Sequence, residues 1–410
     1  MANSNCVYRL TYAVVTPLFL GDALRDARRF SLQSFKGALR FWWRALAWPR
    51  CWEQAGENER KALQQLHERE ARLFGAAGEA GRGHGQSRVR LALDGIHLGA
   101  RLERGQQLDL GPGARYLGYG LVQPFGRQAG ALLRSGFREG GYVRICVAFR
   151  GVAEDERGEV LNALKLLGLL GGLGARVRRG WGSLSLRRIE GADWKPPHNA
   201  QSYIEAIRHI VDRPKAPRPP FSAFSAETRI DLLVTRKHPL QALDAMGVAM
   251  VRHRAWGHKG KILDGKEDSL RLFQDDHDWF KDLVSGKQRH DAPRRSAFGL
   301  PHNYYDSNTK RTAGVTTTGA EGAGDRRASP LFLHVHDLGE AGVLGVATRF
   351  LARFTSDDQV RVHLGKKYYD APMREDWPEV LAGLIEGSYT RSGQSRAFFP
   401  ERRRILPVES

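Results

Sequence analysis

A predicted helix near the start of the chain carries the sharpest chemical pattern. Over residues 34–48, Lys36, Arg40 and Arg44 recur every four residues, and Trp43 stands beside Arg40. Residues four apart lie on the same face of a helix, so the cations would form a ladder. Such a ladder can neutralise successive phosphates while an indole ring stacks on a base. The alternative is a solvated basic face with Trp43 packed on a neighbouring element.

A glycine-rich stretch, residues 171–183, joins a predicted helix to the strand that follows it. Accessible glycine N–H groups and guanidinium groups can bind phosphate oxygens, and a tryptophan can stack on a base. The residues expected to bind RNA here are Gly171, Gly172, Gly174, Arg176, Arg178, Arg179 and Trp181. The stretch is not a P-loop, because it lacks the Gly-Lys-Ser/Thr ending. Glycines also make tight turns, but the arginines favour binding.

A third basic cluster follows a predicted helix in the second half of the chain. It consists of Arg252, Arg254, Trp256 and Lys259, and it fits either an RNA contact or a basic surface loop.

Catalytic or metal-binding patterns are weak. His334 and His336 would share a strand face, but no third ligand is placed beside them. The His-Asp pairs at 277–278, 290–291 and 336–337 fall in loop or strand contexts, and the acidic cluster at 275–278 is expected to cap a helix. We therefore predict no catalytic residue, no metal and no cofactor.

The charge balance points to a polyanionic partner. The 410 residues include 64 Lys and Arg against 45 Asp and Glu, which leaves a formal charge of +19. A field of that sign attracts nucleic acid, although basic charge can also serve solubility alone. No apolar run reaches the ~18 residues of a membrane span, and residues 1–10 lack the pattern of a signal peptide. Cys6, Cys51 and Cys146 lie far apart, as expected of thiols in a reducing cytoplasm.

Residues 1–195 are predicted to form one α+β domain in the order β-α-β-β-α-β, the ferredoxin-like plan, with a glycine-rich insertion over 95–141. Period-two alternation predicts the strands and apolar repeats at helical spacing predict the helices. The expected strands cover 7–15, 88–93, 142–149 and 182–188, and the expected helices cover 34–48, 64–74 and 159–170.

Residues 196–224 are predicted to be a linker, because four prolines in 213–220 favour an extended spacer. Residues 225–410 are predicted to form a second ferredoxin-like domain, with a mobile loop over 314–328. Its strands are expected at 228–235, 331–335 and 343–350, and its helices at 240–250 and 377–386.

Several phrases together resemble the RAMP (repeat-associated mysterious protein) superfamily of CRISPR systems. They are Thr16-Pro-Leu-Phe-Leu-Gly21, Ser34-Phe-Lys-Gly-Ala-Leu-Arg-Phe-Trp-Trp-Arg-Ala-Leu46 and the stretch 171–183. Within that superfamily, the sequence is similar to the first-subunit family of the type III-B Cmr effector module. In the second half, 297–301 and 326–334 carry the same resemblance.

The resemblance implies a non-catalytic RNA-binding subunit near the 3′ end of the guide, with CRISPR guide RNA, target RNA and other Cmr subunits as partners. RAMP nucleases that process guides commonly use a histidine in the first domain, whereas the first histidine here, His67, lies beyond the first helix. Two alternatives remain. One is a metal-independent endoribonuclease using His67, His84 or His97. The other is a protein-only scaffold whose basic charge meets acidic partners.

Overall fold

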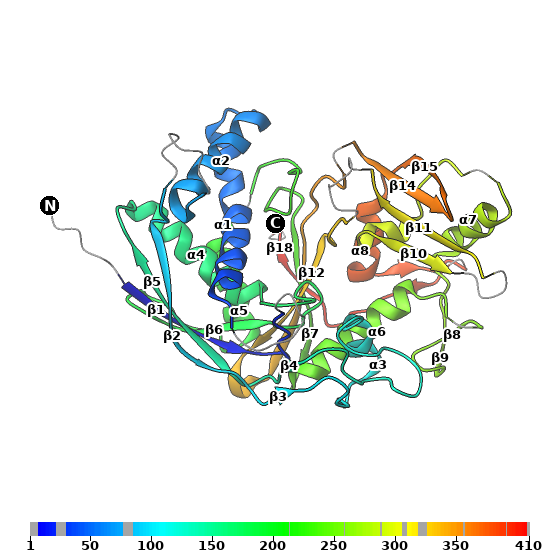
Figure 1. Ribbon diagram of the computed structural model, residues 1–410, viewed down its shortest axis with the longest axis horizontal. Coiled ribbons are helices and arrows are strands. Elements are labelled where there is room, and N and C mark those ends of the chain that lie inside the picture. The colour runs from blue at the N-terminus through cyan, green and yellow to red at the C-terminus, as the bar shows by residue number, and fades with distance from the viewer. Residues whose placement is uncertain are drawn as a thin grey trace.

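A computed structural model describes residues 7–21, 30–76, 85–212, 214–257, 259–287, 289–305, 310–318, 326–355, 357–390 and 392–407. The chain is a mixed α/β structure with antiparallel sheets and helices, arranged as two lobes (Figure 1). None of the helices in these ranges has the length and apolar content that crossing a membrane requires.

The first sheet contains β1 (Val7–Val14), β2 (Val89–His97), β5 (Tyr142–Phe149) and β6 (Leu184–Glu190). Its strands are antiparallel in the order β2-β5-β1-β6. The predicted alternation in β1 is confirmed, since Tyr8, Leu10, Tyr12 and Val14 are all buried. The buried face packs against α1 (Leu32–Gln54) and α4 (Glu154–Leu170), and the Tyr12 hydroxyl donates to Leu164 O at 3.0 Å.

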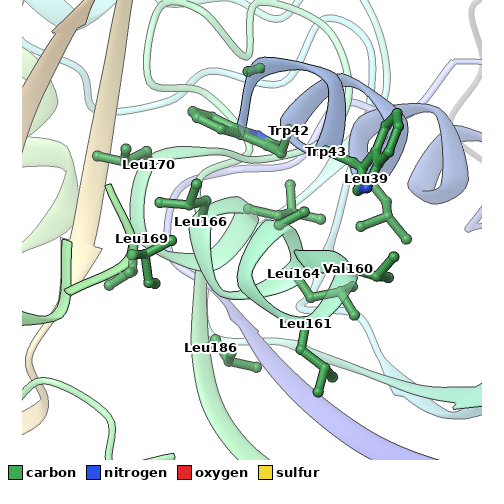
Figure 2. Close-up of a cluster of buried hydrophobic side chains, with 14 of the residues drawn as sticks. Leu39, Trp42, Trp43, Val160, Leu161, Leu164, Leu166, Leu169, Leu170 and Leu186 are labelled. Atoms are coloured by element: carbon green, nitrogen blue, oxygen red, sulfur yellow. The ribbon is translucent and has the colours of Figure 1, made fainter. Parts of the chain in front are cut away.

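Helix α1 begins two residues before the predicted start at 34 and ends later than predicted. Ser31 is the N-cap and accepts a hydrogen bond from Ser34 N at 3.2 Å. The helix continues through Pro49 to Gln54, so the predicted end at residue 48 is wrong. A hairpin then leads into α2 (Glu59–Phe74), capped by Asn58. Figure 2 shows Trp42 and Trp43 of α1 beside the leucines of α4, where they form part of the core.

The second half forms a sheet with the same relative strand order. It contains β7 (Arg229–Arg236), β12 (Leu331–Asp337), β13 (Val343–Arg349) and β18 (Arg403–Leu406), in the order β12-β13-β7-β18. In both sheets, the first strand along the chain lies between the third and the fourth. Helices α6 (Pro239–Arg254) and α8 (Trp377–Glu386) accompany this sheet. The predicted strands and helices here are confirmed, but β18 was not predicted.

The two halves share a buried interface along β12. Phe332 and Val346 face the core of the first half, whereas Leu333 and Val335 face the core that contains α6. Val335 N donates to Ser183 Oγ at 3.1 Å across the interface. Because both faces of this sheet are covered, its strands are almost continuously apolar.

Residues 196–224 are not a linker throughout, because a helix occupies 200–210, whereas the described part of the proline run, 214–220, is neither helix nor strand. The helix is α5 (Ala200–Ile210), which begins with a capping box between Asn199 and Ser202 and buries Tyr203 and Ile207. Phe224 is buried 6.5 Å from the Trp42 ring. The segment is packed between the halves because its apolar side chains fill their interface.

The second half also holds an inserted sheet, β10 (His302–Tyr305), β11 (Thr312–Thr317), β14 (Gln359–Leu364) and β15 (Lys367–Pro372), beside α7 (Gln274–Val284) and η1 (Arg294–Phe298). The expected loop over 314–328 is therefore wrong for 314–317, which lie in β11, and 319–325 lie outside the described residues. Instead of capping α7, Asp276 accepts from Arg294 N at 2.6 Å and Arg295 N at 2.9 Å.

The insertion over 95–141 is tied to the second half. It contains α3 (Pro112–Leu117), whose Gly113 N donates to Asp244 Oδ1 of α6 at 2.8 Å. A Cβ on Gly247 would lie 2.1 Å from Gly113 O, so the two helices touch through backbone. The remaining short elements are β3 (Arg101–Leu102), β4 (Gly136–Phe137), β8 (Lys261–Ile262), β9 (Glu267–Asp268), η2 (Gly339–Ala341), β16 (Ser388–Tyr389) and β17 (Ser395–Arg396).

Candidate nucleic-acid interface

A groove of about 600 Å³ lies between the α1–α2 pair and the segment that leads into β12. It brings together parts of the chain that are far apart in sequence. Its lining comprises Phe41, Arg44, Leu63, Leu66, His67, Glu70, Arg178, Pro220, Phe221, Ser222, Arg326, Arg327 and Ala328. The groove thus joins one cation of the predicted ladder to one arginine of the glycine-rich stretch.

Arg178 is held at the groove by neutral partners. Its guanidinium lies 4.4 Å from the Phe332 ring centroid and donates to Ser329 O at 2.5 Å. The pKa of Arg178 is lowered to about 10, first by burial and then by repulsion from Arg327. Within the described ranges, no carboxylate forms an ion pair with it. Its charge is therefore positioned but not neutralised.

Arg327 and Arg326 extend this positive region. Arg327 donates to three backbone carbonyls, Phe354 O at 2.6 Å, Ala328 O at 2.9 Å and Arg353 O at 3.1 Å. Carbonyl oxygens orient a guanidinium without cancelling its charge. Arg326 is exposed beside it. Both arginines belong to the segment 326–334 that carries the family resemblance, but they were not predicted to bind RNA. A pair of arginines just before a buried strand is a sequence signal that could have identified them.

The predicted ladder on α1 is partly neutralised. Arg40 Nε donates to Glu70 Oε1 at 2.6 Å, and Arg44 Nη1 donates to the same oxygen at 3.3 Å. Glu70 is buried on α2, so it is a fixed counter-charge for both arginines. Burial and the nearby Arg40 lower the pKa of Lys36. Phosphate binding by the ladder stays a prediction. The negative charge of Glu70 weakens the positive field of the ladder on the side that faces α2.

The two tryptophans expected to stack on bases are both fully buried. The Trp43 ring packs on Phe74 with centroids 5.7 Å apart, and Trp181 packs on Phe19 at 5.6 Å. A stacking platform needs an exposed face, so this expectation is contradicted for both rings. Half-buried Phe41 is the aromatic residue of α1 that lines the groove. No role was predicted for Phe41 from the sequence, although it lies about one turn before Arg44.

The glycines of residues 171–183 serve close packing. Gly171 N donates to Leu167 O at 3.2 Å, and Gly182 N donates to Pro17 O at 3.1 Å. A Cβ on Gly172 would lie 2.3 Å from Gly182 O, and one on Gly174 would lie 2.6 Å from Phe19 O. The expectation of an open phosphate cradle at Gly171, Gly172 and Gly174 is therefore contradicted, because the backbone is already packed and bonded.

Comparison with known proteins assigns the first half to a family. The family model for the RAMP superfamily matches residues 11–185, which include α1, α2 and the glycine-rich stretch. Residues 11–185 belong to the RAMP superfamily. No curated protein sequence matches the chain.

Solved structures extend the likeness of fold to the second half. Cmr1 from Pyrococcus furiosus, in its apo form, matches with a TM-score of 0.53 and 14% identity, covering 97% of this chain and 98% of that chain. A chain of a type III-B Cmr-beta complex bound to cognate target RNA matches with a TM-score of 0.46 and 12% identity, covering 93% and 99%. The first likeness shows a shared fold over nearly the whole chain.

The third basic cluster lies outside the RAMP-matched region and apart from the groove lining. Arg252 is bonded to Glu267 at 2.7 and 2.8 Å. Trp256 stacks on His277 at 3.9 Å, with Arg271 5.2 Å from its ring. Lys259 is exposed. Arg252 and Trp256 thus already have partners within the protein.

The histidines of the RAMP fold divide into buried and exposed sets. His334 and His336 share a face of β12 as predicted, with ring centroids 5.8 Å apart, and burial lowers the pKa of both. Within the described residues, no group of three possible ligands could hold a metal ion. His67 is exposed in the groove and His97 is exposed on β2, while His84 lies outside the described residues.

Proposed function

We propose that this chain is a non-catalytic RNA-binding subunit of a type III-B CRISPR effector, and that the groove holds single-stranded RNA. The observation that carries the proposal is the set of Arg178, Arg326 and Arg327 at one groove, where Arg178 and Arg327 are oriented by carbonyls and rings and Arg326 is exposed beside them. Unpaired guanidinium groups suit phosphate oxygens, and the half-buried Phe41 offers an apolar contact for a base.

The likeness to Cmr1 supports the architecture within this proposal. If the four strands of each sheet are numbered along the chain, their spatial order is 2-3-1-4 in both sheets. In both halves, helices follow the first and the third strand. That order supports two ferredoxin-like units in tandem, the second of which is interrupted by the β10-β11-β14-β15 sheet. The proposed partners are guide RNA, target RNA and other Cmr subunits, and the proposed place is near the guide 3′ end in a cytoplasmic antiviral complex.

The test is binding of single-stranded RNA by the purified full-length chain, with Mg²⁺ and with a chelator in parallel. We expect binding that weakens as salt rises, and RNA that stays intact under both conditions. The Arg178→Gln/Arg326→Gln variant should bind less tightly. Absence of RNA binding in the wild type at low salt would contradict the proposal.

A metal-independent endoribonuclease is the second candidate, because His67 is exposed inside the groove beside the cations. A general base must reach the attacking hydroxyl, and an imidazole near unpaired guanidinium groups meets part of that requirement. The same RNA assay separates the candidates. Discrete cleavage products from the wild type that disappear in His67→Gln would establish the nuclease and refute the non-catalytic role.

A further inference from the structure

The glycine-rich stretch presents consecutive arginines to different neighbours. Residues near 178 run beside β12, where Leu333 N donates to Arg178 O at 3.0 Å. Arg178 lies over Phe332 and lines the groove. Arg179 instead lies against α6, where its guanidinium donates to Met250 Sδ at 3.4 Å. A thioether is a weak acceptor and carries no charge, so Arg179 lacks a counter-charge among the described residues.

Arg254, at the end of α6, is a second buried cation of this kind. It is only 8% exposed, and its guanidinium lies 4.3 Å from the Phe298 ring centroid. Its Nε has no hydrogen-bond partner, and no described carboxylate forms an ion pair with it. Half-buried His302, on β10, is near enough to both arginines for their charges to act on its ring. Arg254 lowers the pKa of Arg179, to about 10, and also that of His302, in both cases after burial as the larger cause.

Other buried arginines in the second half are paired. Arg349 is bonded to Glu386 at 2.5 Å and lies 3.5 Å from Asp231. Arg295 lies 3.1 Å from Asp276, whose oxygens also accept from the backbone of η1 and from the Tyr304 hydroxyl. The oxygens of Asp276 are therefore occupied. Among the described residues, Arg349 and Arg295 thus have carboxylate partners, whereas Arg179 and Arg254, like Arg178 and Arg327 at the groove, have none.

An unpaired buried cation costs several kcal/mol of stability unless an anion neutralises it. We propose that Arg179, Arg254 and His302 form a second phosphate-binding site, on the side of the glycine-rich stretch opposite the groove. Guanidinium groups bind two phosphate oxygens at once, and an imidazole can add a third donor. The phosphate could come from RNA that crosses the stretch from the groove, or from free phosphate or a nucleotide. Only the RNA source rests on the proposed function.

The test titrates the full-length protein with inorganic phosphate at constant ionic strength, and follows heat of binding and thermal midpoint. Wild type and the control Arg252→Gln should bind phosphate, because Arg252 is on the same helix but already bonded to Glu267. Arg179→Gln and Arg254→Met should each weaken phosphate affinity by about tenfold or more, the loss of a charged hydrogen bond. Arg254→Met without phosphate should melt no lower than wild type, because it removes an unpaired cation.

A parallel titration with single-stranded RNA identifies the source of the phosphate. If RNA affinity falls in Arg179→Gln together with phosphate affinity, the site takes the RNA backbone. If only phosphate affinity falls, the site takes a free anion, and both results support the site. Should Arg254→Met fail to fold, half-buried Arg179→Gln still decides the matter. Unchanged phosphate affinity in Arg179→Gln, or no phosphate binding by wild type, overturns the site. If the wild type binds phosphate but not RNA, the proposed function is refuted and the phosphate site stands.

Discussion

Two groups of arginines lie in or beside the groove, and they differ in what neutralises their charge. On α1, Arg40 and Arg44 both donate to the buried carboxylate of Glu70. At the glycine-rich stretch, Arg178 has only a carbonyl, a hydroxyl and aromatic rings as partners. The predicted helix 34–48 and the stretch 171–183 each carry three cations in sequence, yet Arg178 of the stretch keeps more of its charge than Arg40 or Arg44. The number of cations in a motif is therefore a poorer guide to RNA binding than the partners that the fold gives them.

The largest predicted effect concerns stability and tests whether the stretch is core as well as interface. Trp181→Ala should lower the free energy of unfolding by about 3–5 kcal/mol, the usual cost of removing a buried tryptophan. The measurement is urea denaturation, with Trp256→Ala as the half-buried control and a smaller loss. A Trp181→Ala variant that keeps its stability and loses RNA affinity would show that the ring is exposed when RNA binds.

The next prediction compares how buried His334 and exposed His67 contribute to the pH dependence of stability. Burial lowers the pKa of His334 to about 3, so the folded state binds its proton less readily than the unfolded state. Stability from this residue is therefore present above pH 6.5 and is lost as the pH falls toward 3. At pH 5 the loss should be about 2 kcal/mol.

The measurement is the free energy of unfolding between pH 7 and pH 5 for wild type, His334→Leu and the exposed-site control His67→Gln. His334→Leu should have a shallower pH dependence than wild type. Identical pH dependence in wild type and His334→Leu would contradict the burial that the fold assigns to this side chain.

The smallest effect tests the counter-charge on α2. Glu70→Gln should tighten RNA binding by about fivefold, because unit charges about 4 Å apart in water interact by about 1 kcal/mol. Glu68→Gln is the matched control, since Glu68 is on the same helix, is exposed and does not line the groove. Equal effects of the two variants would mean that Glu70 does not restrain the ladder.

Sequence patterns predicted the elements that depend on local rules. Alternation predicted β1 and β7. The strands β12 and β13 were also predicted, although they are almost continuously apolar, and helical spacing predicted most of α1. These patterns did not predict β10 or β11, because these short strands bury few apolar side chains and lack a clear alternating pattern. Local spacing thus gave most of the central framework and little of the inserted sheet.

The sequence predicted some of the residues of the candidate site but not how they are arranged. Sequence named Arg44 and Arg178, which the fold brings to one groove. It could not show that Glu70, 26 residues after Arg44, is the partner of the ladder, because that contact depends on how α2 packs on α1. It also could not distinguish Trp43 and Trp181 as core residues, since an indole suits a core and a stacking platform equally.

The central claim is that the groove arginines with no described counter-charge, Arg178 and Arg326, hold RNA phosphates more strongly than the paired arginines of the helix. The direct test compares Arg178→Gln/Arg326→Gln with Arg40→Gln/Arg44→Gln, each of which removes two charges, in RNA affinity measured across salt concentrations. Each lost phosphate contact flattens the log–log salt dependence by about 0.7. We predict a change of about 1.4 for the first pair and less than about 0.7 for the second. An equal or larger change for the helix pair would contradict the account.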